Sequence, residues 1–216
     1  MKVSVSILSN SIKPVDIVKK LDNTKADYIH IDIMDGKFVE NKTWTVSEIK
    51  KITSCSKLPL DVHLMVENPS KYIEEFALLN TSYIAFNYEA VKDIDKMINE
   101  IKKYGLKVGI AINPETSEEV VFPYLSRIDE VLIMSVHPGK SGQSFIESML
   151  EKIKELKQLI DDKNLNVDIQ VDGGIKPDNI HKVVEAGANI IVAGSAIFNS
   201  ENIEETVSLM RKNASL

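Results

Sequence analysis

The feature that most constrains the fold is a regular alternation of short apolar runs with longer segments of helical period. Strands are predicted at Val3–Leu8, Tyr28–Met34, Leu60–Met65, Tyr83–Asn87, Lys107–Ile112, Glu130–Ser135, Val167–Val171 and Ile190–Ala193. The clearest predicted helices are Asp93–Tyr104, Phe145–Ile160, Asp178–Glu185 and Ile203–Lys212. Eight strands at a spacing of about 25 residues predict an α/β fold, a parallel (β/α)8 TIM barrel with outer helices. We expect one such domain over residues 1–216.

Composition narrows the classes of partner. A formal net charge of −6 argues against nucleic acid or an anionic membrane as the main partner. No apolar run approaches the roughly 18 residues that span a bilayer, and the N-terminus lacks the apolar core of a signal peptide. The single cysteine offers no disulfide framework. We therefore expect a cytoplasmic protein whose partner is a small molecule.

The predicted strand Tyr28–Met34 carries an unusual inward face. Its period-2 alternation places His30, Asp32 and Met34 on one side and isoleucines on the other. The next predicted strand places His63 on one face near its end, and Asp172 directly follows the seventh. Two imidazoles and two carboxylates at the carboxyl ends of barrel strands predict a site for one divalent cation. Mixed nitrogen and oxygen ligands suit zinc, iron(II), manganese or cobalt.

Glycine-rich loops follow three of the predicted strands. They are Pro138–Gln143, with Gly139, Lys140, Ser141 and Gly142; Asp172–Ile175, with Gly173 and Gly174; and Ala193–Phe198, with Gly194 and Ser195. Glycines let backbone N–H groups approach an anion, and a short helix beginning near Ser195 would direct its dipole at one. Because phosphate sites of TIM barrels form after strands seven and eight, these loops predict a phosphorylated substrate.

Two further sets of residues lie near the predicted cation site. Met34, Met65 and Met134 fall at or near strand ends, where they either fill core space or form an apolar wall beside a reactive intermediate. Asp61 lies one layer deeper than His63 on the same face. We expect Asp61 to orient a ligand or to have a structural role.

Together these segments resemble the ribulose-phosphate 3-epimerase family from Val5 to Phe198. The matching motifs are Ser6-Ile7-Leu8-Ser9, His30–Val39, Asp61–Val66, Ile133–Gly139, Val171–Ile175 and Val192–Phe198. Six motifs in the same order form a specific signal, whereas any one alone is weak.

The resemblance implies specific roles. It implies a metal bound by His30, Asp32, His63 and Asp172, with Asp32 and Asp172 doubling as the acid/base pair. It implies contact between Ser6 and the substrate, which His63 also contacts. It places the phosphate by Gly142, Gly173, Gly174, Gly194 and Ser195, and the three methionines at the reacting carbons. It further implies a homo-oligomer, either a dimer or a hexamer.

The sequence departs from the family at several positions. Glu40 stands where proline is usual, Asn87 where histidine is usual, and His137, Lys140 and Ser141 alter the loop after the sixth strand. We expect these changes to affect the mouth of the site, and so the identity of the sugar more than the type of reaction.

The resemblance implies inversion of C3 in a phosphorylated ketose without an organic cofactor, and the chemistry of the residues fits that reaction. One carboxylate removes the weakly acidic proton beside the carbonyl and another returns it from the opposite face. D-ribulose 5-phosphate is the expected substrate, and D-allulose 6-phosphate is the closest alternative. A barrel decarboxylase would need an Asp-x-Lys-x-x-Asp pattern, which the segment Asp32–Asp35 lacks. A phosphosugar-binding barrel without activity is the alternative outside enzymes.

Overall fold

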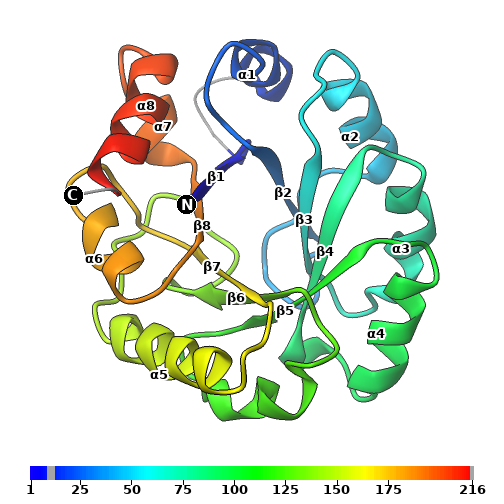
Figure 1. Ribbon diagram of the computed structural model, residues 1–216. Helices are drawn as coiled ribbons and strands as arrows, with labels where there is room; N and C mark the ends of the chain where they lie inside the picture. The colour runs from blue at the N-terminus through cyan, green and yellow to red at the C-terminus, as the bar shows by residue number, and fades with distance from the viewer. Residues whose placement is uncertain (9–12, 215–216) are drawn as a thin grey trace.

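The computed structural model describes residues 1–8 and 13–214, and its strands form one closed barrel (Figure 1). The strands are β1 (Lys2–Ser6), β2 (Tyr28–Met34), β3 (Leu60–Met65), β4 (Thr81–Asn87), β5 (Lys107–Ile112), β6 (Glu130–Met134), β7 (Asp168–Asp172) and β8 (Ile190–Ala193). Each strand pairs in parallel with the next, and β1 pairs with β8 to close the ring. The predicted eight-stranded parallel barrel is confirmed.

Helices surround the barrel on its outside (Figure 1). They are α1 (Pro14–Leu21), α2 (Val46–Thr53), α3 (Ser70–Ala77), α4 (Ile94–Lys102), α5 (Met149–Asp162), α6 (Ile180–Glu185), α7 (Ser195–Phe198) and α8 (Ile203–Asn213). Two 3-10 segments, η1 (Tyr88–Ala90) and η2 (Glu118–Tyr124), follow β4 and β5. Among the described residues, no helix has both the length and the apolar character needed to cross a membrane.

Several predicted boundaries differ from the observed ones. Strand β1 ends at Ser6 rather than Leu8, and Ser9 of the first motif lies outside the described residues. Helix α5 begins at Met149 rather than Phe145, because the N–H of Ile146 donates to the carbonyl of Ser135 at 2.9 Å. That bond holds the segment before α5 against the end of β6, so the helix begins at a later residue.

The start of α6 also differs. The helix begins at Ile180 rather than Asp178, after a turn in which the side chain of Asn179 accepts from the N–H of Lys176 at 2.8 Å. An asparagine side chain that satisfies a backbone donor competes with the helix at such a position. Strand β7, in contrast, extends one residue further than predicted and ends at Asp172 itself.

The barrel wall separates two interiors of different character. Outward-facing side chains such as Ile29, Ile31 and Ile33 are buried in a continuous apolar core that also includes helix residues. The inward faces form a smaller apolar cluster together with buried polar groups. These polar groups include Ser4, His30, Asp32, Asp61, His63, Asn87, Glu130 and Gln170. Because unpaired buried polar groups are costly, most of these side chains hydrogen-bond to one another and so become fixed in orientation, whereas Glu130 has no such partner among the described residues.

Candidate active site and metal centre

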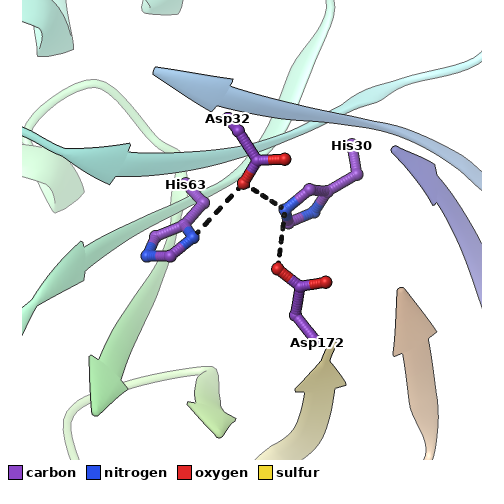
Figure 2. Close-up of side chains that lie close together, drawn as sticks. All are labelled: His30, Asp32, His63 and Asp172. Atoms are coloured by element: carbon purple, nitrogen blue, oxygen red, sulfur yellow. Dashed lines mark hydrogen bonds and ion pairs between the residues drawn. The ribbon is translucent and has the colours of Figure 1, made fainter. Parts of the chain in front are cut away.

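Four side chains from three strands converge at the carboxyl end of the barrel (Figure 2). His30 and Asp32 come from β2, His63 from β3 and Asp172 from β7. One possible ligand atom from each lies within 4.8 Å of the others. His30 Nε2 lies 3.3 Å from Asp32 Oδ1 and 4.0 Å from Asp172 Oδ2, and His63 Nδ1 lies 3.5 Å from Asp32 Oδ1. This buried group could hold a metal ion.

The hydrogen bonds around the two histidines fit that use. His30 Nδ1 faces Asp61 Oδ2 at 2.8 Å, and His63 Nε2 faces Asn87 Oδ1 at 2.9 Å. In the neutral form of each ring, one nitrogen donates its hydrogen bond to that acceptor, so the other nitrogen presents a lone pair to the centre of the cluster. His63 Nδ1 is buried and has no hydrogen-bond partner in the part of the chain that the structure describes. Such an orphaned lone pair is what a metal ligand requires.

The two carboxyl groups of the cluster, Asp32 and Asp172, have pKa values shifted in opposite directions. Burial disfavours the charged form of Asp32, but the charge and the hydrogen bond of His30 outweigh it. They hold the pKa of Asp32 well below its usual range. Burial and the nearby negative charge of Asp32 raise the pKa of Asp172 to about 6. The pair thus combines an ionised carboxylate with one that takes up a proton near neutral pH.

His30 is held in place by Asp61, to which the side chains of Ser4 and Gln170 donate hydrogen bonds. Burial lowers the pKa of His30, but the charges of Asp32 and Asp61 outweigh it and raise that pKa well above its usual range. Asp61 Oδ2 also accepts from Ser4 Oγ at 2.6 Å and from Gln170 Nε2 at 2.7 Å. Asp61 therefore orients His30 through the hydrogen bond to its Nδ1 atom.

A cavity opens above the cluster and contains almost all of the other predicted site residues. Its lining includes Ser6, Met34, Met65, Met134, Gly139, Lys140, Ser141, Gly142, Gly173, Gly174, Gly194 and Ser195, together with Asp32 and Asp172. Ser6 Oγ donates to Asp32 Oδ2 at 3.0 Å, which connects the end of β1 to the cluster. The three methionines lie at strand ends beside it, and the predicted short helix at Ser195 is α7.

The loop after β7 needs glycine for two reasons. Gly173 and Gly174 have φ angles of 125° and 66°, in the region that side chains disfavour. A Cβ atom at Gly174 would lie 2.2 Å from the backbone nitrogen of Phe145, and one at Gly173 would lie 2.5 Å from Val136. These contacts pack the β7 loop against the end of β6 and keep its backbone at the floor of the cavity.

Two predicted positions differ from expectation. His63 does not line the cavity, because its ring is fully buried beneath it. Asn87, which we expected at the mouth, is also fully buried and contacts His63, so that expectation was wrong. The other departures from the family do lie at the rim, in a groove that Glu40 shares with His137 and Lys140.

Sequence reasoning did not assign three buried polar side chains around the cluster to the barrel interior. Ser4, Gln170 and Asn87 lie on the inward faces of their strands, where period-2 spacing from Ser6, Asp172 and Tyr83 would have placed them. The signal was therefore present, but a serine or an amide on a strand is not a distinctive residue type.

The fold and the cavity define a TIM-barrel protein with a histidine–aspartate cluster and glycine-rich loops at one end of the barrel. The ribulose-phosphate 3 epimerase family profile matches residues 2–198. Ribulose-phosphate 3-epimerase of Synechocystis sp. is 42% identical over 214 residues, which cover 98% of this chain and 93% of the relative. The enzyme of the same name from Bacillus subtilis is 39% identical over 213 residues, covering 98% of each chain. The chain belongs to the ribulose-phosphate 3-epimerase family.

Solved structures with low sequence identity share the fold. A 3-hexulose-6-phosphate synthase from Salmonella typhimurium superposes with a TM-score of 0.67 at 14% identity, covering 99% of this chain and 98% of that one. At this identity the likeness concerns the barrel and not the reaction.

Proposed function

We propose that this chain is a metal-dependent epimerase that interconverts D-ribulose 5-phosphate and D-xylulose 5-phosphate in a single barrel domain. The observation that carries the proposal is the pairing of Asp32 and Asp172 in one cavity, with pKa values displaced in opposite directions. The relatives from Synechocystis sp. and Bacillus subtilis bear the name of this activity.

The glycine-rich loops support binding of the sugar phosphate. Backbone N–H groups of Gly173, Gly174, Gly194 and Ser195 provide hydrogen-bond donors for phosphate oxygens, and Gly142 comes from the facing loop. Gly139, Lys140 and Ser141 belong to that same loop, where the Lys140 side chain adds a positive charge. With the phosphate there, the carbon chain extends over the cluster, where Ser6 contacts it.

Proton transfer is assigned to the two carboxylates. Asp32, ionised, removes the proton from C3, and the electron pair of that C–H bond passes into an enediolate. Asp172, protonated, then returns a proton to C3 from the other side, which inverts the carbon. The reverse reaction exchanges the two roles. Met34, Met65 and Met134 exclude water from the reacting carbons and so protect the enediolate from stray protonation.

His30, Asp32, His63 and Asp172 would hold one divalent ion, of which zinc, iron(II), manganese and cobalt suit the donor set. Such an ion supplies Lewis-acid stabilisation for the negative charge that develops on the ketose oxygens. The proposal includes no organic cofactor. We further propose that the chain forms a homo-oligomer, either a dimer or a hexamer, and that it is located in the cytoplasm.

The rim residues favour one alternative substrate. Glu40, His137, Lys140 and Ser141 depart from the family pattern beside the cavity mouth, where a six-carbon ketose would extend further than a five-carbon one. D-allulose 6-phosphate is therefore the second candidate.

The test is turnover of both sugars by protein stripped of metal and reloaded in turn with each of the four metals. We expect metal-dependent epimerisation of D-ribulose 5-phosphate. A strong preference for D-allulose 6-phosphate would keep the reaction and change the substrate. Binding of either sugar without turnover, with metal present, would favour a phosphosugar-binding protein.

A matched pair of substitutions on β7 tests the mechanism. Asp172→Asn removes the proton donor and is expected to reduce kcat by on the order of 10²–10⁴. Asp168→Asn makes the same change at the other end of the strand, where the carboxylate pairs with Lys2 at 2.9 Å, and should leave kcat close to that of the unmodified chain. Near-normal turnover by Asp172→Asn would exclude the two-carboxylate mechanism.

A further inference from the structure

The amide of Asn87 lies on the inward face at the end of β4, with no exposed surface. Its Oδ1 atom faces His63 Nε2 at 2.9 Å. Its Nδ2 atom donates to Asn113 Oδ1 at 3.1 Å and to Glu89 Oε2 at 3.4 Å. Both ends of this side chain are therefore hydrogen-bonded. The oxygen requires a donor, and the NH₂ group requires an acceptor.

Glu89 determines which way the Asn87 amide points. A carboxylate only accepts hydrogen bonds, so Glu89 requires the NH₂ end of the amide on its side. Glu89 is itself held by backbone and hydroxyl donors, because its Oε1 accepts from the N–H of Asn113 at 2.9 Å and from Thr116 Oγ1. A reversed amide would place Oδ1 against the oxygens of Glu89 and Asn113. The acceptor end must then face His63.

The orientation of the amide determines which nitrogen of His63 carries the proton. An acceptor oxygen at 2.9 Å requires Nε2 of His63 to be the donor, which leaves the lone pair of the neutral ring on Nδ1. Nδ1 is the atom that belongs to the four-residue cluster and that has no hydrogen-bond partner among residues 1–8 and 13–214. With the amide reversed, the ring proton would lie on Nδ1 and block a metal ion.

We infer that Asn87 is a positioning residue for the metal centre, which presents His63 to a divalent cation as its Nδ1 ligand, with Glu89 fixing the direction of the amide. The inference rests on the proposed function, because it assumes that the cluster of His30, Asp32, His63 and Asp172 binds the metal. Neither Asn87 nor Glu89 touches the cavity that holds the substrate. Their effect is expected on metal binding.

The test compares three variants of the full chain, with zinc and cobalt(II) as the probes. Asn87→Leu keeps the approximate size but removes the acceptor, and it is expected to weaken metal binding 10- to 100-fold in competition with a chelator. Asn87→Asp keeps the acceptor, and a proton shared with the Glu89 carboxyl group replaces the lost amide donor, so this variant is expected to bind metal within a few-fold of the unmodified chain. Asn189→Leu is the matched control, because Asn189 also uses both ends of its amide, with Ile169 and Asp168, at the opposite end of the barrel.

A second measurement follows the hydrogen bond itself. In the zinc-loaded protein, the Nε2–H proton of His63 should give a slowly exchanging NMR resonance, assigned with ¹⁵N-histidine labelling. We expect this resonance in the unmodified chain and in Asn87→Asp. We expect fast exchange in Asn87→Leu. If that variant does not fold, the resonance in the unmodified chain and in Asn87→Asp still shows whether Nε2 of His63 carries a hydrogen-bonded proton.

The outcomes separate this inference from the proposed function. Equal metal affinity in Asn87→Leu and the unmodified chain, or a rapidly exchanging Nε2–H in the zinc-loaded unmodified chain, overturns the role of Asn87 and leaves the epimerase intact. An unmodified chain that binds neither zinc nor cobalt(II) overturns the metal centre and, with it, this role. A metal-binding chain without epimerase activity, in which Asn87→Leu still loses affinity, keeps the role of Asn87 and removes the proposed reaction.

Discussion

Glu130, the first residue of β6, is a fully buried carboxyl group inside the barrel. Neither of its oxygens has a hydrogen-bond partner among the described residues. Gly109 on β5 provides the space, since a Cβ there would lie 2.7 Å from Glu130 Oε1. Burial, together with the negative charge of Asp61, raises the pKa of Glu130 well above its ordinary value. The folded chain therefore favours the protonated form of this group.

The raised pKa of Glu130 makes the unfolding free energy depend on pH in one direction. Above the ordinary glutamate pKa of about 4.3, the unfolded chain releases this proton while the folded chain keeps it. The unfolding free energy then falls as pH rises toward the folded pKa, by about 1.4 kcal/mol for each pKa unit of displacement. Glu130→Gln removes this dependence, so its stability relative to the unmodified chain should increase from pH 4 to pH 8, as measured by urea unfolding across about that range. Exposed Glu74→Gln is the control. Parallel curves for Glu130→Gln and the unmodified chain would contradict the prediction.

The residues that sequence analysis identified and those that it missed differ in chemical distinctiveness. His30, Asp32 and His63 stand out because a carboxylate is rarely buried unless it is paired, and two histidines accompany this one at strand ends. Asn87 and Glu130 follow the same period-2 spacing but were not assigned to the interior, because their burial depends on partners from other strands. Glu130 fits only beside Gly109, and Asn87 is recognised only through its contact with His63.

A lysine on helix α5 connects the outer ring of helices to the loop after β5. Lys152 on α5 is buried, and its Nζ donates to the carbonyls of Pro114 at 3.1 Å and Thr116 at 2.5 Å, with a third contact to Asn113 at 3.4 Å. Burial lowers the pKa of Lys152. Lys152 thus supplies a side-chain donor to the carbonyls of Pro114 and Thr116 in this loop. The same loop carries the partner of Asn87.

Lys152→Met tests this dependence. Methionine fills the space of the stem but leaves the partly buried carbonyls of Pro114 and Thr116 without this donor, so the unfolding free energy should fall by about 1–3 kcal/mol. Lys154→Met is the matched control on the same helix, because Lys154 is exposed and pairs only with Glu151, at 2.7 Å, among the contacts described. A change below about 0.5 kcal/mol is expected there. Urea unfolding of both variants gives the comparison. An equal effect of the two substitutions would show that the loop does not depend on Lys152.

Strand positions followed from the sequence more closely than helix starts did. The predicted limits of β2, β3, β5 and β8 coincide with the observed ones, because each is a short segment in which apolar residues dominate or alternate with others. The start of α5 did not follow, because the bond from Ile146 to Ser135 joins residues that only the closed barrel brings together. Period and composition report local preference, whereas such a contact depends on the tertiary fold.

In the whole molecule, the four side chains that could hold a metal ion come together only when the barrel closes. The four side chains come from β2, β3 and β7, so an unfolded chain has no preformed site for an ion. A ligand that binds the folded state alone stabilises it by RT ln(1 + [L]/Kd), or about 2.7 kcal/mol at a hundredfold excess over Kd. For a chain of this length, that corresponds to a rise in Tm of about 5–10 °C.

Thermal unfolding of the full chain, stripped of metal and then titrated with zinc, should show that rise. His63→Ala removes one ligand and is expected to lose most of the increase, while His181→Ala, on α6 away from the cluster, should retain it. The comparison separates specific binding from general effects of the ion, because both variants lack one histidine and only one of them lacks a ligand. If zinc raises the Tm of His63→Ala as much as that of the unmodified chain, the ion binds elsewhere, and the cluster at the carboxyl end of the barrel is not the metal centre.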